Sequence, residues 1–203
     1  ALRLAAGEIE TVDTGQRELC LVVLSGTVDV AIDNQTHGNL GMRDSVFDNV
    51  SPAAVYVPAG KVVHIRAVRQ AEEALCSAPS DAGKREVRVI DPATMKRSVR
   101  GKGTNTRHIC DILPHDDPTA AHLLVVEVMT PASHSSSYPP HKHDQETPPT
   151  ETQLEETYYH RLNPPQGFYP ILNGGELAIM YCFVFLYLAA AGGGPWSLDA
   201  KRA

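Results

Sequence analysis

Two histidines separated by a single residue, His141 and His143, are the side chains of this sequence best suited to chemistry. Seven of the nine histidines lie between His108 and His160, and residues 101–203 carry 11 Asp and Glu but only 6 Lys and Arg. Residues i and i+2 of a strand point to the same side, so both imidazoles can face one cavity. Imidazole nitrogens held close together are typical of a site for a divalent metal ion.

A carboxylate is needed to complete such a site, and Glu155 and Glu156 lie in a segment, residues 154–160, that alternates like a strand. Glu156 shares one face of the predicted strand with Tyr158, and Glu155 shares the other face with Tyr159. Only one of the two glutamates can therefore point inward, and the spacing does not decide which. Zn, Mn and Fe all accept imidazole and carboxylate ligands, so the spacing leaves the identity of the ion open.

The same two histidines are also consistent with an ordinary surface pair, and other kinds of site have weaker support. Cys110 lies two residues from His108, a spacing too common to indicate a nucleophile and its base. The sequence has no Gly-x-Ser-x-Gly motif, and the glycines at 192–194 lack the strand–turn–helix setting of a phosphate loop. A metal centre is therefore the site that we expect.

The elements that must position these residues are predicted to be strands. Short β-branched runs recur between turn residues, whereas patterns with the helical period are scarce. Val28, Val30 and Ile32 alternate in one such run. Other strands are expected at residues 19–25, 54–57, 62–68, 123–129 and 154–160, with one or two more in residues 178–188. This pattern predicts an all-β sandwich or barrel, in two similar halves joined by a polar, basic connector.

Composition limits the classes of partner. The 203 residues are 42% hydrophobic and 21% charged, which is the balance of a globular protein rather than of a disordered chain. The net charge of −6 argues against nucleic acid, because a phosphate backbone needs a basic face. The longest uncharged apolar stretch, residues 177–191, is shorter than the roughly 20 residues of a spanning helix. It is expected to be buried strand, and no membrane partner is expected.

The four cysteines, Cys20, Cys76, Cys110 and Cys182, are far apart in the sequence and form no CxxC motif. We expect them to be reduced and mostly buried, as in a cytoplasmic protein. No signal peptide is visible at the beginning of the sequence, because its first ten residues lack a basic region followed by an apolar run.

Several motifs carry a resemblance to a known family. They are GTNTRHICDILP at 103–114, EVMTP at 127–131, SSYPPHKHD at 136–144 and LEETYYHRLNPPQGF at 154–168, with LSGTV at 24–28 and VYVPAG at 55–60 in the first half. Over about residues 7–168 the chain resembles the 5-deoxy-glucuronate isomerase family of myo-inositol catabolism. The family is a bicupin, with two jelly-roll β-barrels in one chain, and is related to the keturonate isomerases of pectin breakdown.

The resemblance implies three parts and one activity. The parts are a metal-free first barrel in residues 1–92, a connector in residues 93–104, and a second barrel with the metal site in residues 105–203. The implied activity is the metal-dependent aldose–ketose isomerisation of 5-deoxy-glucuronate to 2-deoxy-5-keto-gluconate. The implied partner is a small sugar acid, and a homo-oligomer is compatible with this assignment.

The resemblance also implies which of the candidate residues bind the metal ion. In related enzymes the metal is held by the two histidines of an HxH pair, by a glutamate directly before Thr-Tyr-Tyr, and by a late histidine. The first three correspond to His141, His143 and Glu156 here. Tyr158 shares the face of Glu156 and is expected to contact substrate, so both are candidate catalytic residues. No histidine follows His160, and the second barrel is expected to be incomplete after residue 168.

Two other functions remain open. Two histidines and one carboxylate with open positions also suit a non-haem iron oxygenase. The absence of a late histidine favours a degenerate cupin that binds a sugar acid without converting it. Oxygen consumption would identify the oxygenase, and the metal content would separate an inert binder from an isomerase.

Overall fold

The computed structural model describes residues 1–80, 85–135, 143–148 and 150–163. The chain divides into two compact units, Ala1–Tyr159 and His160–Ala203, and nearly all described residues belong to the first. The described residues form twelve β-strands and two short 3₁₀ turns, with no α-helix, which confirms the predicted all-β class. Within this part of the chain, no helix is long and apolar enough to cross a membrane.

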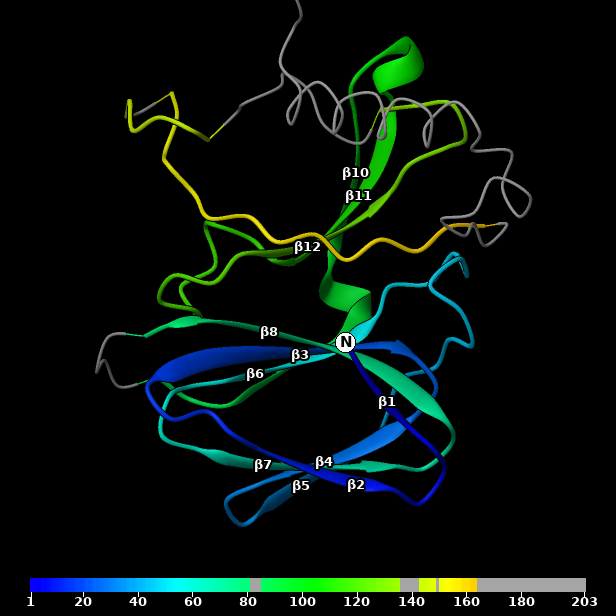
Figure 1. Cartoon of the computed structure of the whole chain (residues 1–203), viewed down its shortest axis with the longest axis vertical. Coiled ribbons are helices and arrows are strands. Elements are labelled where there is room, and N and C mark those ends of the chain that lie inside the picture. Colours follow the sequence, from blue (N-terminus) through cyan, green and yellow to red (C-terminus); the bar gives the residue numbers. More distant parts are fainter. Residues whose placement is uncertain (81–84, 136–142, 149, 164–203) are drawn as a thin grey trace, which may run out of the picture. The chain divides into compact units, whose positions relative to one another are not determined.

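The twelve strands form three antiparallel sheets (Figure 1). The first sheet has the order β1-β8-β3-β6-β9 and consists of β1 (Leu2–Leu4), β3 (Arg17–Ser25), β6 (Ala53–Val57), β8 (Ala71–Pro79) and β9 (Arg88–Ile90). The second has the order β2-β7-β4-β5 and consists of β2 (Ile9–Asp13), β4 (Val28–Ile32), β5 (Gln35–Leu40) and β7 (Val62–Ala67). The third has the order β10-β11-β12 and consists of β10 (Lys96–Arg100), β11 (Arg107–Leu113) and β12 (Val125–Met129).

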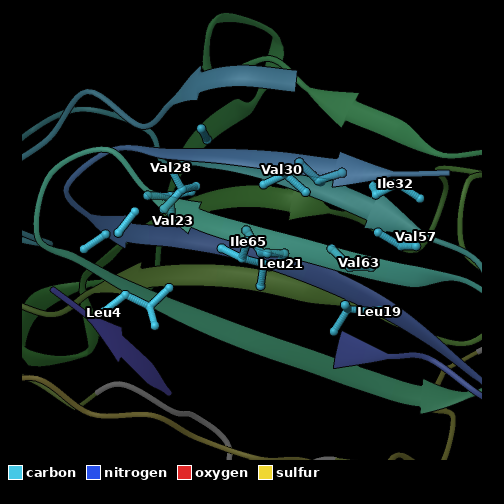
Figure 2. Packing of buried hydrophobic residues seen from close by; sticks show 14 residues of the cluster. Leu4, Leu19, Leu21, Val23, Val28, Val30, Ile32, Val57, Val63 and Ile65 are labelled. Carbon is cyan, nitrogen blue, oxygen red and sulfur yellow. The ribbon is translucent and has the colours of Figure 1, made fainter. Parts of the chain in front are cut away.

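The first two sheets face each other, and the side chains between them form the main apolar core (Figure 2). Val28, Val30 and Ile32 of β4 are at most 2% exposed, as their alternation predicts. Leu21 and Val23 of β3 belong to the same core and come from the first sheet. Removing such side chains from water stabilises the fold by roughly 1.5–3 kcal/mol each.

The first sheet is covered on its other face as well. Cys20 and Val22 of β3 and Tyr56 of β6 pack in a second apolar cluster, together with Cys110 and Ile112 of β11. Strand β3 is therefore buried on both faces, which explains why residues 19–25 are a continuous apolar run rather than an alternating one.

The turn between β3 and β4 requires glycine. Gly26 has a φ of +85°, and a Cβ at this position would lie 2.2 Å from the carbonyl oxygen of Gln70 and 2.6 Å from the Cα of Ala71. The backbone of this turn therefore packs directly against the beginning of β8.

Most of the predicted strands are present: residues 19–25, 54–57, 62–68 and 123–129 correspond closely to β3, β6, β7 and β12. The segment expected to be a connector, residues 93–104, contains β10, which pairs with β11 along its whole length. The sequence of β10, Lys-Arg-Ser-Val-Arg, has almost no apolar residues, because the strand is largely exposed. The boundaries proposed for the two barrels stay a prediction.

The strand predicted at residues 154–160 was wrong, because the structure assigns neither helix nor strand to residues 152–160. Alternation alone does not make a strand, since a ladder needs a neighbouring strand with which to exchange hydrogen bonds. The strands expected in residues 178–188, the apolar stretch 177–191 and Cys182 lie outside the described residues.

Candidate metal centre

His143 is tied to the segment that leads to Glu156. Its backbone N–H donates to the carboxylate of Glu151, and its carbonyl accepts from the N–H of Leu154 at 3.1 Å. Between His143 and Leu154 the chain turns, and the backbones of Thr147 and Glu151 exchange hydrogen bonds. His143 has a φ of +74°, a conformation that is uncommon for a residue with a Cβ and is held here by these bonds. The turn at Thr147 therefore brings His143 next to residues 151–154.

The imidazole of His143 has a defined orientation. Its Nδ1 lies 3.0 Å from the carbonyl oxygen of Thr152, an acceptor, so Nδ1 carries the proton and donates. The proton on Nδ1 leaves Nε2 with its lone pair. Histidines that bind metals usually donate their other ring N–H to a carbonyl or carboxylate in this way, which fixes the tautomer. The orientation of the His143 ring thus leaves Nε2 available to a metal ion.

Glu156 and Tyr158 contact each other, in agreement with the face that they were predicted to share. The Tyr158 hydroxyl donates to Oε2 of Glu156 at 2.6 Å, and the Tyr158 side chain is 60% exposed. The hydrogen bond to Glu156 raises the pKa of Tyr158 above its ordinary value, with smaller contributions from burial and from the negative charge of Glu156. The phenol is therefore protonated at neutral pH, and in this structure its one proton is given to Glu156.

The predicted ligands are only partly covered by the structure. His141 lies outside the described residues, and among those that are described no three His, Cys, Asp or Glu side chains meet at a point that could hold a metal ion. His143 and Glu156 lie on the same short stretch of chain, joined through residues 151–154. The metal centre stays a prediction. Glu156 and the alternative ligand, Glu155, are both exposed.

Two other described histidines, His64 and His134, have local partners. His64 is exposed on β7, and its Nδ1 lies 3.0 Å from the hydroxyl of Thr11. His134 is bonded to the carbonyl of Ala132 within its own loop. Cys110 is a free thiol that lies 3.7 Å from the sulfur of Met95, and burial raises its pKa, which makes it a poor nucleophile.

Sequence reasoning missed a buried carboxylate, Glu18 of β3. Its side chain is fully buried and accepts the N–H groups of Ala121, His122 and Leu123 at 2.7–2.8 Å, and the hydroxyl of Tyr56 at 2.8 Å. Burial raises the pKa of Glu18, but these four donors together lower it below its ordinary value. The carboxylate therefore stays charged and holds the chain that enters β12. The one feature of the sequence that could have indicated this buried carboxylate is the place of Glu18 at the start of an apolar strand.

A second buried charge, Arg43, joins β3 and the segment before β6 to β12. Its guanidinium makes two bonds of 2.8 and 2.6 Å to the carboxylate of Glu127 and donates to the carbonyls of Leu24 and Val50. The Arg43 side chain is 1% exposed. The two N–H groups of the guanidinium match the two carboxylate oxygens, so this ion pair fixes the distance and the orientation of the Glu127 side chain relative to Arg43.

The chain resembles known proteins over most of its length. Residues 1–172 match the KduI/IolB family. A relative from Geobacillus kaustophilus, named 5-deoxy-glucuronate isomerase, is 44% identical over 165 residues, which are 81% of this chain and 59% of the relative. A relative of the same name from Bacillus subtilis strain 168 is 42% identical over 167 residues, which are 82% of this chain and 61% of the relative.

A solved structure agrees with this assignment. The crystal structure of an IolB-like protein from Salmonella typhimurium LT2 superposes with a TM-score of 0.77 at 43% identity, covering 81% of this chain and 62% of that one. The chain thus spans about three fifths of the length of the relatives that it matches.

Proposed function

Because the chain belongs to the KduI/IolB family, we propose that it is an aldose–ketose isomerase that converts 5-deoxy-glucuronate to 2-deoxy-5-keto-gluconate. The observation that carries the proposal is the family match over residues 1–172, a span that contains His141, His143, Glu156 and Tyr158. The name shared by the curated relatives supplies the substrate.

The proposed ligands of a divalent metal ion are His141, His143 and Glu156. The orientation of His143 supports this assignment, because its Nδ1–H is given to Thr152 and its Nε2 is left for an ion. Two imidazoles and one carboxylate suit Zn, Mn and Fe. Such an ion would polarise the substrate's carbonyl and the neighbouring hydroxyl, which would favour loss of the C–H proton from the carbon that carries this hydroxyl.

Tyr158 is the proposed contact between the chain and the reacting end of the sugar. Moving a carbonyl by one carbon requires a proton to leave one carbon and another to reach its neighbour. The Tyr158 hydroxyl is protonated at neutral pH, and when substrate is bound it can give its one proton to a sugar oxygen in place of Glu156. Its role is to orient that oxygen and stabilise the charge that develops on it.

The test is an assay of the purified protein with 5-deoxy-glucuronate and added Mn²⁺, with the product identified by NMR. We expect conversion that stops when the ion is chelated. His143→Ala should weaken Mn²⁺ binding and lower kcat/KM, each at least about tenfold. His64→Ala is the matched control, because this histidine is exposed on β7 and bonded only to Thr11 among the described contacts. It should leave both quantities unchanged.

Each remaining outcome contradicts a stated part of the proposal. If the protein binds the sugar acid but does not convert it at saturating Mn²⁺, it is a binding protein and not an isomerase. Consumption of oxygen with Fe²⁺ would identify an oxygenase. Conversion that continues after chelation would contradict the metal dependence but not the isomerisation.

A further inference from the structure

Tyr159 connects the segment of the candidate site to the first sheet. Its hydroxyl donates to the carboxylate of Glu72 on β8, 87 residues away in the sequence. The Glu72 side chain is only 10% exposed and also lies 3.4 Å from the guanidinium of Arg3 on β1. A phenol bonded to a charged carboxylate is a strong, charge-assisted contact.

Glu72 is a rigid anchor because of its place in the sheet. Strand β8 is paired on both sides, with β1 and with β3, and Glu72 itself lies opposite Arg3 and Ser25. Its neighbours Ala71 and Glu73 are buried, so the backbone here cannot shift without disturbing the first sheet. A group bonded to Glu72 is therefore fixed relative to that sheet.

The segment between His143 and Tyr159 needs such an anchor. Residues 152–160 have no regular secondary structure, so no ladder of hydrogen bonds fixes the side chains that they carry. At one end Leu154 donates to the carbonyl of His143, and at the other end Tyr159 bonds Glu72. Glu156 and Tyr158, which are bonded to each other, lie between these two attachment points.

We infer that Tyr159 is a positioning residue for the isomerase site, acting through Glu72 to hold Glu156 and Tyr158 in place. The inference rests on the proposed function. Adjacent side chains of an extended segment point in opposite directions, so Tyr159 can hold the sheet while Tyr158 faces the substrate. Loss of the bond loosens the segment without removing a ligand or a catalytic group.

The test compares Tyr159→Phe and Glu72→Met, each of which lacks one partner of this hydrogen bond, with the wild type. Both variants should weaken Mn²⁺ binding, measured by calorimetry, about tenfold and lower kcat about tenfold with little change in KM. The double variant should be no worse than either single variant, because both remove the same bond. Arg3→Met is the matched control. It removes a second partner of Glu72, which is exposed, and should leave Mn²⁺ affinity and kcat at the wild-type values.

Thermal unfolding and hydrogen exchange separate positioning from general stability. The amides of residues 154–158 should exchange faster in Tyr159→Phe, while those of β3 and β8 keep their protection. Unchanged Mn²⁺ affinity and unchanged exchange at 154–158 would overturn the inference. Losses of Mn²⁺ affinity and kcat that are fully explained by a larger fraction of unfolded protein would overturn it as well.

The two proposals fail in different ways. A wild-type protein that binds Mn²⁺ but converts no substrate contradicts the isomerase, while the effect of Tyr159→Phe on Mn²⁺ affinity still decides the positioning role. A wild-type protein that neither binds Mn²⁺ nor converts substrate overturns both.

Discussion

Glu73 of β8 is a carboxyl group that the fold buries without a donor. It is fully buried, and within the described part of the chain neither oxygen has a hydrogen-bond partner. Its strand neighbours are Leu2 and Val23, both packed in or against the main core. Burial, with a smaller contribution from the charge of Glu72, raises the pKa of Glu73 to about 7.

This environment predicts how the stability of the protein depends on pH. Below about pH 4.5 Glu73 is protonated in both the folded and the unfolded chain. As the pH rises toward 7, the unfolded chain ionises while the folded one keeps its proton, so the free energy of unfolding falls, on the order of 2 kcal/mol by pH 8. Glu73→Gln should abolish this fall. Urea unfolding at pH 5 and pH 8 measures it, and an equal fall in the variant would contradict the assignment.

Tyr158 carries a prediction that concerns the reaction alone. Its side chain is largely exposed, so Tyr158→Phe should change the free energy of unfolding by less than about 0.5 kcal/mol. The lost hydroxyl should lower kcat about ten- to a hundredfold while Mn²⁺ binding is kept, because the phenol is proposed to act on substrate rather than on the ion. Steady-state kinetics beside Mn²⁺ titration checks this. A wild-type kcat would remove Tyr158 from the reaction.

At the level of elements, Glu18 fastens the entry to β12 onto β3. Glu18→Gln replaces an acceptor oxygen by a donor that faces backbone N–H groups, and removes the charge that those groups stabilise. We expect a loss of about 2–4 kcal/mol in the free energy of unfolding at pH 7. Glu10→Gln, on an exposed part of β2, should change it by less than about 0.5 kcal/mol.

The pH dependence of this loss has the sign opposite to that of Glu73. The pKa of Glu18 is lowered in the folded protein, so its contribution is fully present above about pH 4.5 and is lost as the pH falls through the folded value. The difference between wild type and Glu18→Gln should therefore shrink in acid. Chemical denaturation from pH 7 down to pH 3 measures this, and a constant difference would show that the charge has no part in it.

For the molecule as a whole, Glu18 and Arg43 join the first sheet to the third. Both are buried charges with partners far along the chain, Glu18 at residues 121–123 and Arg43 at Glu127. Together with the apolar cluster on β3, β6 and β11, they make the sheets depend on each other. Separate unfolding of either sheet would leave a buried charge unpaired.

This coupling predicts one cooperative transition for the sheets. Slow amides of β3 and β11 should exchange with the same free energy of opening, as measured by native-state hydrogen exchange. Arg43→Met should lower both values together by about 3–5 kcal/mol. Lys61→Met, which removes the more exposed ion pair with Asp33, should lower them by less than about 1 kcal/mol. Two different opening energies in the wild type would contradict the coupling.

The sequence by itself determined the all-β class, the positions of β3, β4, β6, β7 and β12, and the family. The local pattern of apolar residues shows which faces of a strand are buried. Val28, Val30 and Ile32 alternate because one face of β4 packs in the core. Residues 19–25 are continuously apolar because β3 packs on both faces. The spacing of Glu156 and Tyr158 likewise indicated their shared face, since the period of an extended chain is two residues.

Only the tertiary structure decided which partners these side chains have. The backbone donors of Glu18 lie more than 100 residues away, and Glu127 lies 84 residues from Arg43, so no local pattern indicates either contact. Strand β10 was missed because an exposed strand needs few apolar residues, and residues 154–160 were mistaken for a strand because alternation cannot show whether a neighbour exists. Pairing and long-range hydrogen bonds depend on distance in space, which the order of residues along the chain does not record.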